Sequence, residues 1–428
     1  MSGVPEAVKG TVDLLPPQGE RHLAVREALV APARRAGYGY VETPALELTE
    51  LFARGVGDTT DVVNKEMFSF ADRGGRSVTL RPEGTVSVVR AALAASLDRG
   101  PLPVKLWYSG AMFRYEQPQA GRQRQFWQVG AEALGSEDPA LDAELVGLAD
   151  DGFRALGLAQ TELLINSLGD PEDRVAYSAT LRGWLGDRVG GLDAETDRRI
   201  ERNPLRVLDD KRPEVRARTE GAPLLSASLS AAAQAHHDAV RQHLTDTGVT
   251  FTDDPRLVRG LDYYRRTTFE FVHPLLGAQS TIGAGGRYDG LAESIGGPRL
   301  PGVGWALGVE RTLLALEAEG VAVPTPGVVA VFGVPLGAAA KSLLVRLVAE
   351  LRRRDVGADM AYGDRGVKGA MKAADRSGAR FALVLGDRDL EADAAQVKDL
   401  ESGEQDTVPL PRLVDVLVER CTSMRSAQ

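Results

Sequence analysis

The sequence is poor in the residues that build covalent frameworks and metal sites. Cysteine occurs once among 428 residues, at Cys421, which excludes a disulfide framework and a thiolate metal site. The five histidines form no HExxH or mixed Cys/His ligand pattern, so we expect no structural zinc. No Gly-x-Ser-x-Gly turn marks a serine nucleophile, and the single cysteine lacks a catalytic setting.

Long apolar runs are also absent. No stretch of 18 or more apolar residues occurs, and the first residues, MSGVPEAVKGTVDLLPP, lack the apolar core of a secretion signal. We therefore expect no membrane partner and a cytoplasmic location. The 51 basic residues are outnumbered by 60 acidic ones, a net charge of −9 that by itself disfavours a nucleic-acid binder. A basic surface on one part of a large enzyme remains compatible with that total.

The chain is long enough for two or three domains, and its composition changes along its length. Helices and strands alternate up to about residue 169. A densely charged, helix-rich stretch follows over residues 170–250, and strands and glycines return over residues 251–322. We therefore predict one α+β domain, residues 1–169 and 251–322, interrupted by a helical insertion.

A second domain is expected over residues 328–428. Residues 320–327 are rich in proline and glycine and predict a linker before it. Beyond the linker, strands and helices alternate as in a small α/β domain with parallel strands. Its many lysines and arginines suit contact with phosphate, although the interspersed acidic residues fit an ordinary solvated surface as well.

Two expected strands, residues 106–116 and 125–134, form an antiparallel hairpin. Alternate residues of a strand share one face of the sheet. One face of the hairpin would then present the polar side chains of Arg114, Glu116, Gln128 and Glu132. Such a face is either a ligand floor or a solvent-facing sheet with cross-strand ion pairs. The connecting loop adds Gln119, Arg122 and Arg124, and its cations suit phosphate.

Charged residues also stand out in other segments. Residues 257–272, LVRGLDYYRRTTFEFV, read as a strand, yet they include Arg259 and other charges that rarely enter a core unpaired. Glu83 precedes a helix expected over residues 84–98, where it either binds an ammonium group or favours the helix N-terminus. Arg311 lies in the first turn of a later helix and opposes the helix dipole, which indicates a bound anion or an ion pair.

The glycine-rich stretch TIGAGGRYDGL, residues 281–291, matches neither common phosphate-loop pattern. No Gly-Lys-Ser/Thr follows it, and Tyr288 stands where a dinucleotide fingerprint has its third glycine. Its glycines would allow a ligand to approach the backbone closely.

Taken in order, these segments resemble the motifs of the histidyl-tRNA synthetase family, a group of class II aminoacyl-tRNA synthetases. KGTVDLLPP resembles its N-terminal segment, GYGYVETPALE its motif 1, YSGAMFRYEQPQAGRQRQFWQVGAE its motif 2 and GVGWALGVER its motif 3. LVRGLDYY and AGGRYDGL resemble its two histidine-specific signatures. The resemblance extends from about Val8 to Arg420. Gln117 and Gln123 depart from it, where an arginine and a tyrosine are more usual, which bears on contacts with ATP or the acceptor stem.

The resemblance implies an antiparallel-sheet catalytic domain with a helical insertion, followed by an anticodon-binding domain of α/β type. It implies a homodimer that attaches L-histidine to tRNA(His) in two steps. The histidine carboxylate first attacks the α-phosphate of ATP, with release of pyrophosphate, and the acyl group then passes to the terminal ribose of the tRNA. Mg²⁺ is expected to bridge phosphate oxygens, with no other metal held by the protein.

The matching motifs also imply roles for individual residues. Arg259 and Arg114 are expected to be catalytic, through positive charge at the α-phosphate. The residues expected to bind ATP are Arg114, Glu116, Arg122 and Arg311. Those expected to bind histidine are Glu83, Thr85, Gln128, Glu132, Tyr263, Tyr264 and Tyr288, of which Glu132, Tyr264 and Tyr288 contact the imidazole. Gln119 and Arg124 are expected at the acceptor end of the tRNA.

Two other functions compete with this one. A catalytically inactive paralogue that regulates ATP phosphoribosyltransferase in histidine biosynthesis would share the catalytic fold but would lack the second domain and have degraded signatures. A non-enzymatic sensor of histidine or RNA on a synthetase fold is more remote. ATP–pyrophosphate exchange separates the enzyme from both.

Overall fold

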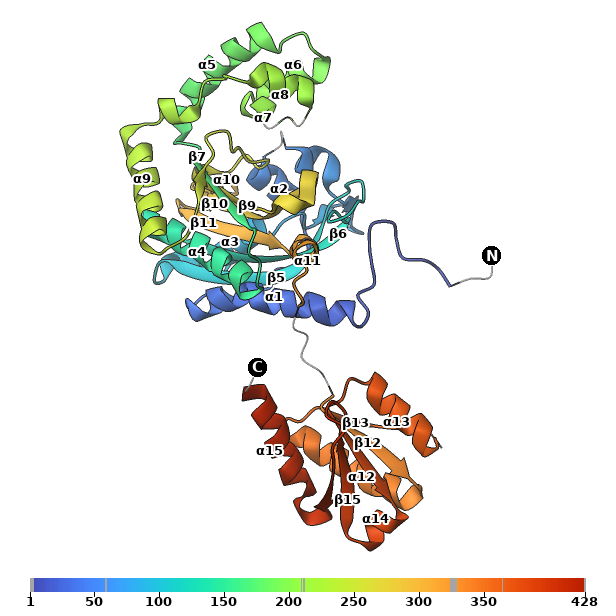
Figure 1. The fold of residues 1–428 in the computed structure, drawn as a ribbon. Coiled ribbons are helices and arrows are strands. Elements are labelled where there is room, and N and C mark those ends of the chain that lie inside the picture. Colours follow the sequence, from blue (N-terminus) through green and yellow to red (C-terminus); the bar gives the residue numbers. More distant parts are fainter. Residues whose placement is uncertain are drawn as a thin grey trace. The chain divides into compact units, whose positions relative to one another are not determined.

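The computed structural model describes residues 4–57, 60–208, 210, 212–323, 329–363 and 365–426. The chain divides into two compact units, Met1–Pro324 and Thr325–Gln428, each with its own buried apolar clusters (Figure 1). The expected linker is described only as far as Val323, and the rest of that prediction lies outside the described residues.

A large, mainly antiparallel sheet is the framework of the first unit. Its strands are β1 (Gly39–Tyr40), β5 (Val104–Phe113), β6 (Gln125–Leu134), β7 (Glu162–Ser167), β8 (Thr252–Asp253), β9 (Arg265–Val272), β10 (Thr281–Arg287) and β11 (Gly302–Gly308). Within the described residues they lie in the order β1-β5-β6-β11-β10-β9-β7-β8. The central pairs are antiparallel, whereas β1 and β8 at the two edges pair in parallel.

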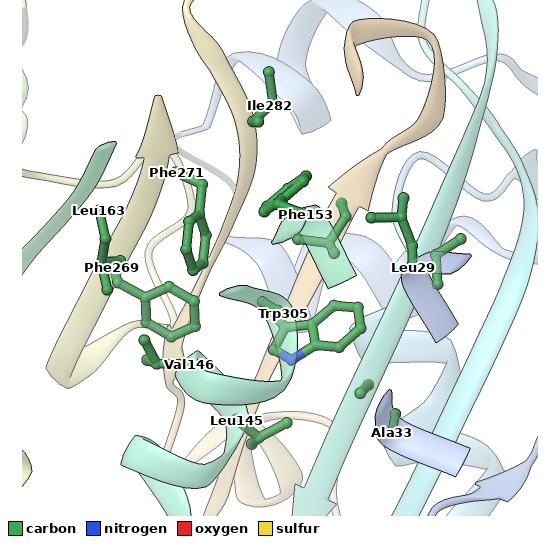
Figure 2. Close-up of a cluster of buried hydrophobic side chains, with 14 of the residues drawn as sticks. Leu29, Ala33, Leu145, Val146, Phe153, Leu163, Phe269, Phe271, Ile282 and Trp305 are labelled. Atoms are coloured by element: carbon green, nitrogen blue, oxygen red, sulfur yellow. The ribbon is translucent and has the colours of Figure 1, made fainter. Parts of the chain in front are cut away.

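Helices cover one face of this sheet and enclose the main core. They are α1 (Gln18–Arg35), α4 (Pro139–Ala155), α9 (Ala231–Asp246) and α11 (Val309–Glu319). α1 packs on α4 and α11, and α4 packs on α9 and β11. Figure 2 shows Trp305 of β11 at the centre of this core, between Leu29 of α1, Phe153 of α4 and the two phenylalanines of β9. This burial fixes the sheet to its helices.

The face of the sheet away from these helices carries smaller side chains, because successive residues of a strand alternate between the two faces. In β11, Val303, Trp305 and Leu307 all belong to the main apolar core, and Figure 2 shows Trp305 within it. Gly304 and Ala306 therefore point to the other face, because successive side chains of a strand alternate. The large residues of β11 thus pack against the helices, and its small residues leave space on the opposite face of the sheet, called the open face below.

Shorter elements lie toward that open face. They are α2 (Thr49–Val56), α3 (Thr85–Ala94), α10 (Leu291–Ser294) and a small sheet with the order β2-β4-β3, made of β2 (Leu46–Leu48), β4 (Ser77–Leu80) and β3 (Ser69–Ala71). Phe52 and Val56 of α2 share a second apolar cluster with Val86 and Val89 of α3. The start of α3 is thereby fixed beside the sheet.

Between β7 and β8 the described residues form helices. These are α5 (Pro171–Arg188), α6 (Ala194–Arg202), α7 (Leu205–Leu208), α8 (Pro213–Thr219) and α9, and α5–α8 project from the sheet in Figure 1. Asp170 and Asp173 form a capping box at the start of α5, and Asp193 caps α6. Arg212 joins Asp193 and Asp210, which ties α6 to the segment before α8.

The second unit is a five-stranded sheet between helices. Its elements are β12 (Val331–Leu336), α12 (Ala338–Arg353), β13 (Ala358–Met360), α13 (Val367–Arg376), β14 (Phe381–Gly386), α14 (Asp387–Glu391), β15 (Ala394–Asp399), β16 (Gln405–Pro409) and α15 (Leu413–Ser426). The strand order is β13-β12-β14-β15-β16. No helix in the described part of the chain has the length and apolarity to span a membrane.

Several sequence-based boundaries were wrong. In the second unit β12, β13 and β14 are parallel, as predicted, whereas the additional strands β15 and β16 pair antiparallel. The helix expected over 84–98 ends at Ala94, and Ser96 adopts a left-handed φ of 55°. The hairpin strand expected to reach residue 116 ends at Phe113, since the Tyr115 amide leaves the sheet to donate to the Glu66 carbonyl.

Candidate active site

A cavity of about 180 Å³ lies on the open face of the large sheet. Its walls come from β6, β10, β11, the start of α3, the loop before β9 and the start of α11. It is lined by most of the predicted site residues: Glu83, Thr85, Arg114, Glu116, Arg122, Gln128, Arg259, Tyr263, Tyr264 and Arg311. The fold therefore gathers residues from five separate sequence segments at one place.

The floor of the cavity includes two small residues in register on neighbouring strands, Ala306 of β11 and Ala284 of β10. Gly130 of β6 lies opposite Ala306 of β11, which lies opposite Ala284 of β10. Glu270 of β9 continues the row beyond Ala284. Sequence reasoning had noted the glycine-rich strands but had not identified this floor, because register between distant strands cannot be read from either strand alone.

Arginines dominate one side of the cavity. Arg311 donates to the carbonyls of Gly121 and Thr281, at 3.0 and 2.8 Å, and to the Gln279 amide oxygen at 3.1 Å. None of these acceptors is a carboxylate, so the Arg311 charge is oriented without being neutralised. Burial, and then the nearby charge of Arg122, lowers the pKa of Arg311. An anion in the cavity would relieve this accumulation of positive charge.

The other arginines are held by partners from different elements. Arg114 donates to the Pro82 carbonyl at 2.9 Å, and Arg122 forms an ion pair with Glu116 at 2.5 Å. Arg259 forms an ion pair with Glu270 and lies over the Tyr264 ring, 5.6 Å from its centroid. These contacts direct three cationic groups toward one cavity.

Arg259 does not lie in a strand, which corrects the interpretation of residues 257–272. The strand begins only at Arg265, and the preceding residues form a loop at the cavity. Asp262 donates its backbone amide to Val56 of α2, and Leu257 donates to Asp254. The apolar residues that suggested a strand serve instead to pack this loop against the second apolar cluster.

Two buried carboxylates define the other side. Glu83 accepts hydrogen bonds from the amides of Thr85 and Val86, both at 2.9 Å, so it does stabilise the start of α3. Glu132 is completely buried and accepts from the Thr85 hydroxyl at 2.7 Å and the Tyr288 hydroxyl at 2.5 Å. Burial raises the pKa of Glu132 to about 8, and the bonds from the two hydroxyls oppose that rise.

Aromatic rings close this end of the site. The Tyr263 ring lies 4.6 Å from that of Tyr264 and 5.8 Å from that of Tyr288. The Tyr263 hydroxyl lies 3.5 Å from a Glu83 oxygen. Two carboxylates among three tyrosines suit a small ligand that carries N–H donors on an aromatic ring or an ammonium group.

Some predicted residues lie outside the cavity lining. Glu132 and Tyr288 lie behind Thr85, to which Glu132 is bonded. Gln119 is exposed in the loop after β5. Arg124 stacks on Tyr115, 3.9 Å from the ring centroid, and its backbone amide donates to the Gly10 carbonyl.

Other lining residues were missed from the sequence. Glu310 lines the cavity, and its carboxylate accepts from the Trp127 amide at 3.0 Å. Thr281 also lines it and donates to Glu270 at 3.0 Å. Glu310 adjoins Arg311 in the sequence, a signal that could have identified it. The pairing of Glu270 with Arg259 left no local signal.

A mainly antiparallel sheet with arginines and buried carboxylates around a small-residue floor is the catalytic domain of a class II aminoacyl-tRNA synthetase. The family model described as histidyl-tRNA synthetase matches residues 10–173 and 188–312, and the model of an anticodon binding domain matches residues 330–420.

Individual proteins show the same relationship. The histidine–tRNA ligase of Streptomyces coelicolor is 59% identical over 416 residues, which is 97% of each chain. That of Saccharopolyspora erythraea is 60% identical over 413 residues, 96% of this chain and 98% of its own. The crystal structure of apo histidyl-tRNA synthetase from S. aureus has a TM-score of 0.82 at 36% identity and covers 97% of this chain and 100% of its own. The chain belongs to the histidyl-tRNA synthetase family.

The regulatory alternative is not favoured. A structure described as an ATP phosphoribosyltransferase regulatory subunit/histidyl-tRNA synthetase from Bacillus halodurans C shares the fold, with a TM-score of 0.63, but only 20% identity. The ligases are far more similar along nearly the whole chain. The second unit, which that alternative would lack, is present and matches an anticodon-binding domain.

Proposed function

We propose that this enzyme activates L-histidine with ATP in the cavity on the large sheet and transfers the histidyl group to tRNA(His). The observation that carries the proposal is the meeting of unneutralised arginine charge with a pocket of buried carboxylates in a single cavity. One end suits the phosphates of ATP, and the other suits a small amino acid with a polar ring. The reacting carboxylate and α-phosphate would meet over the small-residue floor.

The first step needs positive charge where the α-phosphate is attacked. Arg259 and Arg114 both line the cavity and are the proposed catalytic residues. Arg311, held by carbonyl groups, is proposed to bind the far phosphates, and Glu116 and Arg122 to complete the ATP site. These groups act by orientation and electrostatics, since no nucleophilic side chain is required.

Histidine is proposed to bind at the carboxylate end. Glu83, Thr85 and Gln128 would hold its ammonium and carboxylate groups, while Glu132, Tyr264 and Tyr288 would contact the imidazole and Tyr263 would lie beside them. An apolar competitor of similar size would leave the buried Glu132 without its ligand partner. Selection of this kind discriminates strongly without an editing site.

Mg²⁺ is proposed to accompany ATP. The described residues contain no group of three or more His, Cys, Asp or Glu side chains that could hold a metal ion, so phosphate oxygens would supply most of its ligands. Glu116 and Glu310 are the carboxylates in the cavity lining close to the arginines. The cation would neutralise phosphate charge when bound.

The tRNA is proposed to contact both units. We assign the catalytic domain to residues 1–169 and 251–322, the insertion to residues 170–250 and the anticodon-binding domain to residues 328–428. The division after Pro324 and the family match over residues 330–420 support these limits. Gln119 and Arg124, in the loop beside the cavity, would meet the acceptor end.

A homodimer is proposed on the basis of an exposed apolar surface. Tyr40, Leu46, Leu48 and Phe70 lie on strands β1, β2 and β3, and each is about half exposed. Leu48 and Phe70 flank Val78 on the small sheet, and neighbouring exposed apolar side chains of this size are typical of a surface covered by a partner. We also propose that the enzyme works in the cytoplasm, where its substrates and tRNA are present.

ATP–pyrophosphate exchange with each standard amino acid in turn tests the proposal. Exchange should depend on L-histidine alone. Exchange that requires another amino acid, or none with any, would refute it.

A further inference from the structure

Thr281, the first residue of β10, is linked by hydrogen bonds to two arginines of the cavity, and no role has been given to it. Its hydroxyl donates to the Glu270 carboxylate at 3.0 Å, and that carboxylate forms the ion pair with Arg259. Its backbone carbonyl accepts from Arg311 at 2.8 Å. One residue of the cavity lining therefore joins the two guanidinium groups that are proposed to hold the α-phosphate and the far phosphates.

A β-bulge places the Thr281 side chain on the open face of the sheet. In a regular strand Thr281 would share a face with Gly283, and a Cβ atom added at Gly283 would meet two side chains of the main core. The pairing with β9 shifts here, because Thr281 and Gly283 lie opposite the consecutive residues Val272 and Phe271. Ile282 is the extra residue, and its side chain also belongs to the main core (Figure 2). Bulges redirect side chains in this way and are frequent beside active sites.

The bulge brings the Thr281 hydroxyl to the face on which Glu270 lies. Phe269 and Phe271 belong to the main core, so Glu270 between them points to the open face. One oxygen of its carboxylate accepts from the Thr281 hydroxyl, and the other oxygen pairs with Arg259. A carboxylate bonded at both oxygens is held in one orientation, and it holds its guanidinium partner in turn.

Arg259 needs such support because it lies on the loop before β9 and not in a strand. Its side chain has few other fixed contacts. The guanidinium lies over the Tyr264 ring, and its Nε atom is buried without a hydrogen-bond partner among the described residues. A guanidinium is planar, so the carboxylate that fixes one nitrogen also sets the direction of the remaining N–H groups. Those groups are then directed at an oxygen of the substrate.

We propose that Glu270 and Thr281 are positioning residues for adenylation. Thr281 holds the Glu270 carboxylate, and Glu270 holds the Arg259 guanidinium at a fixed place relative to Arg311. This inference rests on the proposed function of the cavity. Because Arg259 is paired with a carboxylate in the free enzyme, its effect on the reacting α-phosphate depends on its orientation more than on unneutralised charge. Loss of either positioning residue should therefore slow the chemical step and leave substrate binding nearly unchanged.

The first test is Thr281→Val in the full-length enzyme, measured by ATP–pyrophosphate exchange. Valine keeps the branched shape and the backbone carbonyl that accepts from Arg311, but it lacks the hydroxyl. The kcat should fall about tenfold, as for loss of one hydrogen bond to a charged group, while the KM values for histidine and ATP change less than about twofold. Thr281→Ser retains the hydroxyl and should keep kcat within about twofold of the wild type.

Glu270→Asp is the second variant. It keeps the negative charge beside Arg259 but withdraws the carboxylate by one methylene group. It should also lower kcat about tenfold or more with little change in either KM, because a small displacement of a positioned group is costly to the reaction rate. A wild-type kcat in either Thr281→Val or Glu270→Asp would overturn the proposal.

The effect should also depend on Arg259. In an Arg259→Ala background, adding Thr281→Val should lower the remaining exchange rate by less than about twofold, because the group that Thr281 helps to position is gone. A general disturbance of β10 would instead lower the rate by the same factor in both backgrounds. That result would overturn the assignment.

Thr407→Val is the matched control. Thr407 lies on β16 in the second unit, and its hydroxyl donates to the side-chain oxygen of Gln396 on the neighbouring strand at 3.0 Å. This variant loses a similar cross-strand bond and should keep the wild-type kcat for exchange. Failure of the wild type to exchange with histidine would refute the proposed function of the cavity, whereas the outcomes for the variants concern Glu270 and Thr281 alone.

Discussion

Glu132→Gln provides a test in which stability and substrate binding should respond in opposite directions. Glu132 is completely buried, and the groups that contact its carboxylate are the neutral hydroxyls of Thr85 and Tyr288. No lysine or arginine among the described residues pairs with it. Its charge is therefore poorly compensated in the free enzyme, and burial raises its pKa from 4.5 to about 8.

The sign of the stability effect follows from proton binding. Between pH 4.5 and about 8 the folded protein holds a proton on Glu132 that the unfolded chain has released. The free energy of unfolding therefore falls as the pH rises through this interval and levels off above it. A difference between 4.5 and about 8 corresponds to at most about 5 kcal/mol. Glutamine is nearly the same shape and does not titrate, so the variant should lack this contribution.

Urea unfolding of the ligand-free protein at a series of pH values from 5 to 9 measures the difference. The stability of Glu132→Gln relative to wild type should increase with pH by a few kcal/mol. Its kcat/KM for histidine in pyrophosphate exchange should nevertheless fall by roughly tenfold or more, because an amide cannot replace the anionic acceptor for the imidazole N–H. The KM for ATP should change little.

The matched control is Glu144→Gln. The Glu144 carboxylate pairs with Lys105 and accepts from Tyr38, outside the cavity lining. This variant should not reproduce the pH-dependent gain in stability. If the free energies of unfolding of wild type and Glu132→Gln differ by the same amount at every pH from 5 to 9, burial does not raise the pKa of Glu132.

Three further predictions address catalysis, domain roles and assembly. Arg259→Ala should lower the exchange rate by roughly 100- to 1000-fold in a folded protein, whereas Arg256→Ala, outside the cavity lining, should not; a near-normal rate for the first variant would remove Arg259 from the mechanism. A chain ending at Thr325 should still form histidyl-adenylate but charge tRNA poorly, and charging at the full-length rate would contradict the role of the second unit. Leu48→Asp should lower the molecular mass found by sedimentation, whereas the same change at Val345, equally exposed on α12, should leave it unaltered; an unchanged mass for Leu48→Asp would place the interface elsewhere.

The sequence alone predicted what depends on local pattern. The period-two alternation in residues 125–134 placed Gln128 and Glu132 on one face, and the structure has them on one strand, β6. The helix expected to carry Arg311 in its first turn is α11, Val309–Glu319. The ordered motifs predicted the family and the reaction, and the comparisons confirmed both.

Only the tertiary structure decided how distant segments meet. The bonds from Thr85 and Tyr288 to Glu132 and the pairing of Arg259 with Glu270 each join separate elements. None of these contacts has a local signature, because their geometry depends on strand register and on the loop path before β9. Local periodicity determines which face a side chain occupies, whereas packing across the whole sheet determines which side chain it meets.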